Sequence, residues 1–279
     1  MELLTSKDNT SISLPNLKSA ISGSPPMFLH NETLVICETD YTKKCLRLEG
    51  GSWTEYNSLN DARDSASSVS TSTTNFIFGG YQRHDYTFEY LEQNSNDWML
   101  GTTNLPYIFY KGCAVAISQN EIWLIGGSID GGEPINNILS FNVSSQTFSN
   151  LSIQLLDDKG RYSHKCTKIP GTQSIIVTGG DNGKEKIDTT EIIDIENMSV
   201  IKSGSMHFIR ADHGIGILNI DNHDRVVVFG GSKDEYGNNL KSVEVFNTQS
   251  EKWEISNIEL SEARSEFGFL TIKNNPEFK

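Results

Sequence analysis

Basic side chains are scarce in this chain relative to acidic ones. Its 279 residues include 23 lysines and arginines against 36 aspartates and glutamates, which gives a formal net charge of −13 at pH 7. Nucleic-acid phosphates require a net basic footprint on the protein, and the anionic surface of a membrane attracts one as well. We therefore expect neither nucleic acid nor a membrane among the partners.

Long apolar runs are also missing. Apolar runs such as those at 226–229 and 175–177 fall far short of the roughly 20 residues that a membrane-spanning helix needs. The N-terminal stretch MELLTSKDNT lacks the basic start and the apolar core of a signal peptide. The sequence thus predicts a cytoplasmic protein, and its hydrophobic content of 36% suits a single domain over 1–279 with a large buried core.

Cysteine is rare, and its spacing excludes common metal sites. Cys37, Cys45, Cys113 and Cys166 form no CxxC pair, and no histidine lies at a metal-ligand offset from them. Reduced, buried thiols are the usual state of such cysteines in the cytosol. We expect free thiols, no metal and no cofactor.

What the chain does contain is an internal repeat. A short apolar run that ends in two glycines occurs four times, and the copies recur about every 50 residues, a spacing typical of repeat architectures. The four doublets are Gly79-Gly80, Gly126-Gly127, Gly179-Gly180 and Gly230-Gly231. A degenerate fifth copy at 34–38 keeps the apolar run without the glycines.

The surroundings of each doublet repeat too. A short β-type segment precedes each apolar run, a polar loop and an alternating strand follow it, and an aromatic residue opens an outermost strand at Trp53, Trp98, Phe148 or Trp253. Each unit therefore predicts four short strands, here called a, b, c and d. The complete units span 26–60, 63–105, 110–156, 161–206 and 210–260.

This pattern resembles the kelch repeat, whose marks are a Gly-Gly doublet after strand b, a tryptophan about 20 residues later and a period near 50. The resemblance, which extends to the galactose oxidase type of propeller, spans nearly the whole chain and implies an all-β, kelch-type β-propeller with one four-stranded blade per repeat. The doublets are expected where strand b leaves close to a neighbouring backbone with positive φ. The tryptophans are expected to cover one blade against the next.

The two chain ends predict how the ring closes. Residues 1–22 align with strands c and d of the last complete unit, and 262–279 resemble strand a. Together they predict a sixth blade built from both ends. Five blades with additional tails are the alternative, because residues 273–279 are polar and carry Pro276 where strand b would follow.

Loops d–a and b–c share one face of a propeller, and this face concentrates arginine and tyrosine. Each arginine at a d–a position either ties its loop to a neighbouring carbonyl or carboxylate, or contributes a guanidinium fork to a ring that binds a carboxylate or phosphate. Adaptor proteins with kelch propellers hold extended, often acidic peptides on this face, and tyrosine and arginine are enriched in binding hot spots. The predicted partner-binding residues are Arg63, Tyr81, Arg83, Tyr107, Arg161, Tyr162, His164, Arg210, His213, Tyr236 and Arg264.

The resemblance therefore implies a non-enzymatic module that binds a protein or peptide. An acidic segment of the partner would fit the arginines, and actin is one candidate partner. Catalytic residues are not predicted. Galactose oxidase binds copper through tyrosine and histidine, but the six histidines here are scattered. Kelch-type specifier proteins bind iron through an acid-x3-Asp-x3-His pattern that is absent. The leading enzymatic alternative is a protein that acts on a carbohydrate acid, similar to the sialate mutarotases. Arg161, Arg210 and Asp212 would bind the acid.

Overall fold

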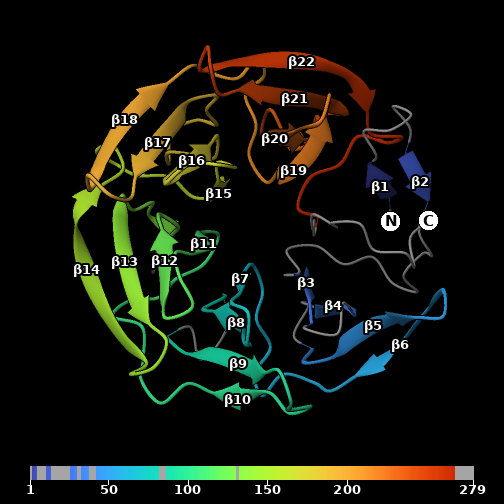
Figure 1. Cartoon of the computed structure of the whole chain (residues 1–279), viewed down its shortest axis with the longest axis vertical. Helices are drawn as coiled ribbons and strands as arrows, with labels where there is room; N and C mark the ends of the chain where they lie inside the picture. Colours follow the sequence, from blue (N-terminus) through green and yellow to red (C-terminus); the bar gives the residue numbers. More distant parts are fainter. Residues whose placement is uncertain are drawn as a thin grey trace.

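A ring of radially arranged β-sheets forms the molecule in this computed structural model (Figure 1). The structure describes residues 2–4, 11–13, 26–29, 33–37, 42–81, 86–129 and 132–267. Within these ranges no helix has the length and apolarity needed to cross a membrane. The all-β class and the kelch-type repeat architecture predicted from the sequence are confirmed.

Five antiparallel sheets of four strands are the blades, and in each the strands follow chain order from the inside of the ring outward. Blade 1 comprises β3 (Pro26–Phe28), β4 (Leu34–Cys37), β5 (Cys45–Glu49) and β6 (Ser52–Tyr56). Blade 2 comprises β7 (Ser67–Ser70), β8 (Thr74–Phe78), β9 (Phe88–Glu92) and β10 (Met99–Leu100). Blade 3 comprises β11 (Cys113–Ala116), β12 (Glu121–Ile125), β13 (Asn137–Asn142) and β14 (Thr147–Gln154).

The remaining two blades have the same order. Blade 4 comprises β15 (Lys165–Lys168), β16 (Ser174–Thr178), β17 (Thr190–Asp194) and β18 (Ser199–Ser203). Blade 5 comprises β19 (Gly214–Ile220), β20 (His223–Phe229), β21 (Ser242–Asn247) and β22 (Lys252–Glu259).

The prediction of six four-stranded blades is not met, because the described residues contain five. The chain start adds a two-stranded hairpin of β1 (Glu2–Leu4) and β2 (Ser11–Ser13). Its register, with Leu4 opposite Ser11, reproduces that of β21 with β22, where Phe246 lies opposite Trp253. The innermost strand expected within 262–279 lies outside the described residues from 268 onward. The alternative of five blades with additional terminal segments matches what is described.

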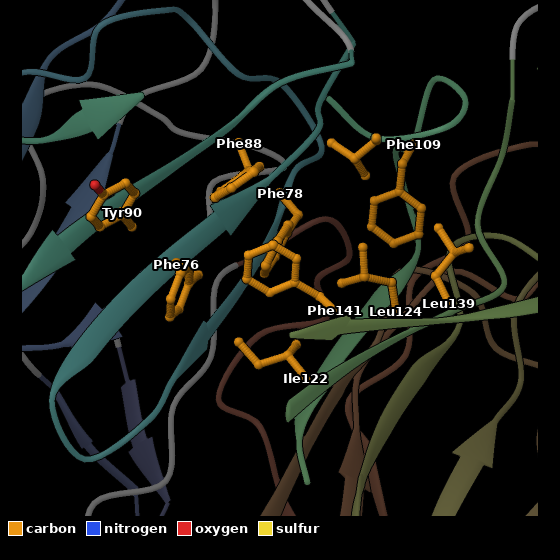
Figure 2. Packing of buried hydrophobic residues seen from close by; sticks show 10 residues of the cluster. Phe76, Phe78, Phe88, Tyr90, Phe109, Ile122, Leu124, Leu139 and Phe141 are labelled. Atoms are coloured by element: carbon orange, nitrogen blue, oxygen red, sulfur yellow. The ribbon is translucent and has the colours of Figure 1, made fainter. Parts of the chain in front are cut away.

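Apolar side chains fill the space between neighbouring blades, because a blade buries both of its faces only against its neighbours. Strand β8 is buried along its whole length, whereas the outermost β14 exposes most of its residues. Between blades 2 and 3, Phe78 and Phe88 pack edge-on against Phe141 at centroid distances of 5.1 and 4.9 Å (Figure 2). Such edge-to-face contacts stabilise aromatic cores beyond the area that they bury.

The glycine doublets join each blade to the next, as the sequence predicts. Both glycines of every doublet have positive φ. The second donates its backbone N–H to a carbonyl in the next blade; Gly180, for example, donates to Arg210 O at 2.9 Å. The predicted tryptophan role is confirmed for Trp253, which is buried against blade 4 and donates from Nε1 to Thr190 Oγ1 at 3.0 Å.

All four cysteines form disulfides, so the prediction of free thiols is wrong. Cys37 and Cys45 are opposite residues of β4 and β5 within blade 1. Cys113 and Cys166 join the innermost strands β11 and β15 of two adjacent blades. Tertiary structure brings the second pair together across 53 positions of sequence, which spacing could not show. Disulfides are typical of oxidising compartments, and the cytoplasmic location stays a prediction.

Strained residues line the ring just before its innermost strands. Ser65, Lys111, Ser163, Asp212 and Glu266 all have φ between 53° and 57°, a region that non-glycine residues rarely adopt. From Lys111 onward, the backbone N–H of each of these residues donates to the carbonyl oxygen of the preceding member of the series, at 2.9, 2.7, 2.9 and 3.0 Å. These bonds hold the d–a loops of successive blades together beside the central axis.

Candidate functional site

The arginines of the d–a loops are buried inside the blades. Arg63, Arg161 and Arg210 have exposed fractions of 2%, 1% and 0%. The guanidinium of Arg210 donates to Gly230 O at 2.7 Å and to Glu244 Oε1 at 2.7 Å. Arg161 repeats this arrangement with Gly179 O at 3.0 Å and with Glu191, and Arg63 with Gly79 O at 2.8 Å and Glu89 Oε1 at 2.9 Å.

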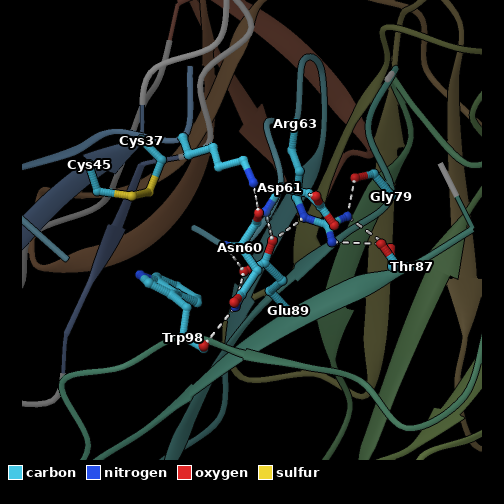
Figure 3. A network of polar contacts seen from close by, with 10 residues as sticks. Cys37, Cys45, Asn60, Asp61, Arg63, Gly79, Thr87, Glu89 and Trp98 are labelled. Atoms are coloured by element: carbon cyan, nitrogen blue, oxygen red, sulfur yellow. Dashed lines mark hydrogen bonds and ion pairs between the residues drawn. A yellow bond between two sulfur atoms is a disulfide. The ribbon is translucent and has the colours of Figure 1, made fainter. Parts of the chain in front are cut away.

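Each paired glutamate on strand c also accepts backbone N–H groups from the loop that carries the arginine. Glu89 binds the N–H groups of Asn60 and Asp61 at 2.6 and 3.0 Å (Figure 3). Glu191 binds that of Leu156 at 2.8 Å, and Glu244 that of His207 at 2.7 Å. The arginine and glutamate together therefore fasten the d–a loop to its blade.

Burial decides between the two readings of these arginines. It lowers the pKa of Arg161 and Arg210, and the adjacent Glu191 and Glu244 oppose that shift. Because their donors are directed into the blades, the prediction that Arg63, Arg161 and Arg210 form exposed forks for a partner is wrong. The reading that each ties its loop to neighbouring carbonyls and a carboxylate is confirmed.

The two remaining d–a positions differ from these three buried arginines. Phe109 occupies the arginine position of blade 3 and is buried in the core between blades 2 and 3. Arg264 is partly exposed, with 28% of its side chain accessible, and its Nε donates to Glu262 O at 3.3 Å. Of the four predicted arginine forks in the described residues, only Arg264 reaches solvent. Arg83 lies outside the described residues.

The two histidines predicted to bind a partner also lie inside the molecule. His164 and His213 are fully buried, with Nε2 at 3.0 Å from Ile125 O and 2.8 Å from Thr178 Oγ1. Burial lowers the pKa of His164 to about 3 and that of His213 well below its usual value, so both are neutral. Gly126 leaves the room for the ring of His164, since a β-carbon there would lie 2.7 Å from its Cε1. Their prediction as partner-binding residues is wrong.

The predicted tyrosines divide into packed and exposed ones. Tyr107 is half-buried against the aromatic core of blades 2 and 3, and desolvation raises its pKa. Tyr81 and Tyr236 expose 60% and 91% of their surface in the b–c loops of blades 2 and 5. Tyr162 is half-buried in the d–a loop of blade 4.

These exposed loops form the surface that we call the tyrosine face. It comprises the exposed Tyr81, Glu235 and Tyr236, the partly buried Tyr110, Lys111, Tyr162, Lys165 and Asp212, and the buried Asp181. The rings of Tyr81 and Tyr110 lie 5.3 Å apart, and Lys111 Nζ lies 5.8 Å from the ring centre of Tyr162. Backbone bridges hold Tyr110 to Ser128 and Tyr162 to Asp181. The tyrosine face thus combines aromatic rings with charges of both signs.

Burial is the main influence on the hydroxyl of Tyr162. Desolvation, together with the charges of Asp181, Glu235 and Asp212, raises its pKa to about 12. Desolvation lowers the pKa of Lys165, which Asp212 opposes and Lys111 reinforces.

Sequence reasoning missed Lys111 and Lys165 as site residues. Their positions in the repeat could have indicated them. Lys111 stands two residues after the arginine position of its own repeat, and Lys165 stands four residues after Arg161. Among the described residues, no group of three or more histidine, cysteine, aspartate or glutamate side chains is arranged to hold a metal ion.

Comparison with protein families assigns the chain to one of them. The family model described as "KLHDC2/KLHL20/DRC7 Kelch-repeats domain" matches residues 65–275, which is more than half of the sequence. The chain belongs to the kelch-repeat family. No curated protein matches it.

A solved structure supports the kelch-type architecture. The protein of the structure titled "Structure of YjhT" superposes with a TM-score of 0.75, covering 91% of this chain and 88% of that one. The two sequences are 14% identical, so the similarity concerns the fold. Since kelch propellers serve many functions, the function must be argued from the site.

Proposed function

We propose that this kelch propeller is a non-enzymatic module that binds a protein or peptide segment on the tyrosine face. The observation that carries the proposal is the exposure of Tyr81 and Tyr236, at 60% and 91%, in the b–c loops of blades 2 and 5. Tyrosine supplies a large contact area at a low entropy cost and is enriched in binding hot spots.

Hydrogen bonds hold the backbone at both tyrosines. Tyr236 follows Asp234, whose Oδ1 accepts the N–H of Tyr236 at 3.0 Å. Tyr81 donates its N–H to Asp64 O at 2.7 Å. A binding surface that is already ordered loses little conformational entropy on association, which favours affinity.

The carbohydrate-acid alternative loses its main support. It relied on Arg161 and Arg210 to bind a carboxylate, and both guanidinium groups are buried in ion pairs with Glu191 and Glu244. Of the groups named for that site, Asp212 alone belongs to the tyrosine face. We therefore propose binding without turnover.

Capture of a partner from native cell extract tests this proposal. We expect the wild-type chain to retain a protein that Tyr81→Ala/Tyr236→Ala loses. The control Met99→Ala/Ile255→Ala removes exposed apolar side chains from the outer strands β10 and β22 and should retain that protein. Equal capture by the two variants, or no capture by any form, would contradict binding at the tyrosine face.

A further inference from the structure

We infer that Asn142, Asn150 and Asn197 carry N-linked glycans, which project from the outer part of blades 3 and 4. Each of these asparagines begins an Asn-x-Ser triplet whose middle residue is not proline, the acceptor sequence of N-glycosylation. Asn9 and Asn31 begin two further triplets of the Asn-x-Ser/Thr type, and both asparagines lie outside the described residues. The inference concerns a covalent modification and does not depend on the proposed binding function.

The folded chain presents all three triplets to solvent. In each one the asparagine and the serine are exposed, whereas the middle residue is partly buried. Val143 packs against the core between blades 2 and 3, and Leu151 and Met198 pack against the core between blades 3 and 4. Neighbouring side chains of a strand point to opposite faces, so the burial of Leu151 in β14 directs Asn150 and Ser152 outward. A transferase and a bulky glycan therefore meet no part of the core at these positions.

The positions of the triplets in the blades leave the tyrosine face open. Asn142 ends β13, and Asn197 lies in the turn between β17 and β18, so both belong to c–d turns. Asn150 lies on β14, the outermost strand of blade 3 (Figure 1). In an antiparallel blade the c–d turn lies at the end opposite to the b–c and d–a loops. Glycans at Asn142 and Asn197 would therefore point away from the tyrosine face.

The modification is compatible with the hydrogen bonds of the two turns. Transfer joins Nδ2 of the asparagine to C1 of the first sugar of a polyprenyl-diphosphate-linked oligosaccharide. The bond from that carbon to the diphosphate breaks, the polyprenyl diphosphate leaves with the electron pair, and a base of the transferase takes one amide proton. The amide keeps its oxygen and one N–H. Asn142 needs only its Oδ1, which accepts the N–H of Ser145 at 2.9 Å, and Asn197 needs one N–H, which Nδ2 donates to Asp194 Oδ2 at 2.8 Å.

The disulfides indicate the compartment in which this transfer takes place. All four cysteines are paired, one pair within blade 1 and one between blades 3 and 4. Disulfides form in secreted proteins and in the lumen of the endoplasmic reticulum, and Asn-x-Ser acceptors are likewise a feature of secreted proteins. Two chemically unrelated features thus agree on one compartment. The inference and the cytoplasmic location predicted from the N-terminal stretch exclude each other, so one experiment decides between them.

Mass spectrometry of the natural protein, purified from its own cells, tests the inference. Peptide N-glycosidase releases a glycan and converts its asparagine to aspartate, which takes up a heavy oxygen atom when the reaction is run in heavy-oxygen water. After reduction, trypsin yields peptide 112–159 with Asn142 and Asn150, and peptide 187–202 with Asn197. We expect labelled aspartate at all three positions, and only after treatment with the enzyme. Asn120, which is exposed in the first peptide but begins no such triplet, should stay unlabelled.

A matched pair of variants, produced in the same cells, shows whether the triplets direct the modification. The first removes the hydroxyl of each triplet and should lose the label at all three positions: Ser144→Ala/Ser152→Ala/Ser199→Ala. The control replaces three other exposed serines of the same two blades and should keep the label: Ser145→Ala/Ser149→Ala/Ser205→Ala. Both variants should keep wild-type stability, because the substituted side chains are exposed.

The possible outcomes decide the inference position by position. Unlabelled asparagine at all three positions would overturn it and leave the cytoplasmic prediction standing. Label at one or two of them would overturn it for the others. Label that persists in the first variant would also overturn it, because that label would then come from deamidation independent of the triplets. None of these results bears on binding at the tyrosine face, which capture from extract tests separately.

Discussion

Replacing Arg161 with methionine should destabilise the propeller severely. Arg161 is buried, and its guanidinium donates to Gly179 O, to Thr189 O at 3.1 Å and to Glu191. Without the arginine, Glu191 would keep a buried charge with no counterion. Breaking a buried pair in this way costs about 3–5 kcal/mol, a large part of the roughly 5–15 kcal/mol that stabilises a typical domain.

The double variant Arg161→Met/Glu191→Met should be no less stable than either single variant. Two independent effects of that size would sum to roughly 6–10 kcal/mol, whereas replacing a whole buried ion pair with apolar side chains is often close to neutral. A remaining cost of about 1–3 kcal/mol is expected, because the N–H of Leu156 would lose Glu191 as its acceptor.

Urea denaturation followed by tryptophan fluorescence measures these differences. Arg161→Lys keeps the charge and loses the fork, so it provides a milder variant if Arg161→Met fails to fold. Arg264→Met serves as the control and should cost less than about 1 kcal/mol, because Arg264 is partly exposed and its partner Glu262 is solvated. A loss below about 1 kcal/mol in Arg161→Met would refute the structural role assigned to these arginines.

Three further predictions concern the ring itself. Burial lowers the pKa of His164 from 6.5 to about 3 and that of His213 well below its usual value, so the folded chain binds fewer protons than the unfolded one below pH 6.5. Each histidine should then lower the free energy of unfolding by about 1.4 kcal/mol per pH unit as the pH falls, and His164→Gln should reduce the slope measured in a denaturation series by about that amount. Loss of the Cys113–Cys166 disulfide, which closes a loop of 53 residues, should cost about 4 kcal/mol; unchanged urea midpoints in Cys113→Ser would contradict this. Gly179→Ala should lower the free energy of unfolding by more than about 3 kcal/mol, because the added β-carbon would overlap a backbone oxygen at a φ of 56°. Gly237 also has a positive φ but faces open space, so Gly237→Ala should lower it by only about 1 kcal/mol. Thermal melts of the two variants measure this difference.

Local patterns in the sequence were sufficient to predict the blade. The Gly179-Gly180 doublet marks a place where strand b ends against a neighbouring backbone, and only glycine meets both the positive φ and the lack of space. Trp253 has to bury a large indole, and the adjacent blade offers the nearest apolar surface. These requirements act over a few residues or between consecutive repeats, so they leave a periodic signal. The repeated arginine was visible in the sequence for the same reason, although the direction of its side chain was not.

Other features depend on contacts within and between blades that the spacing of residues in the sequence does not record. The direction of Arg161, inward onto Glu191, is set by a carboxylate 30 positions later on strand c of the same blade. The Cys113–Cys166 disulfide depends on β11 lying beside β15. The contact of Lys111 with Tyr162 depends on the d–a loops of blades 3 and 4 meeting beside the axis. The sequence by itself thus determined the repeat, the fold family and the glycine positions. Only the tertiary structure decided which charged side chains are buried and which reach solvent, because burial depends on what surrounds each side chain in the folded ring.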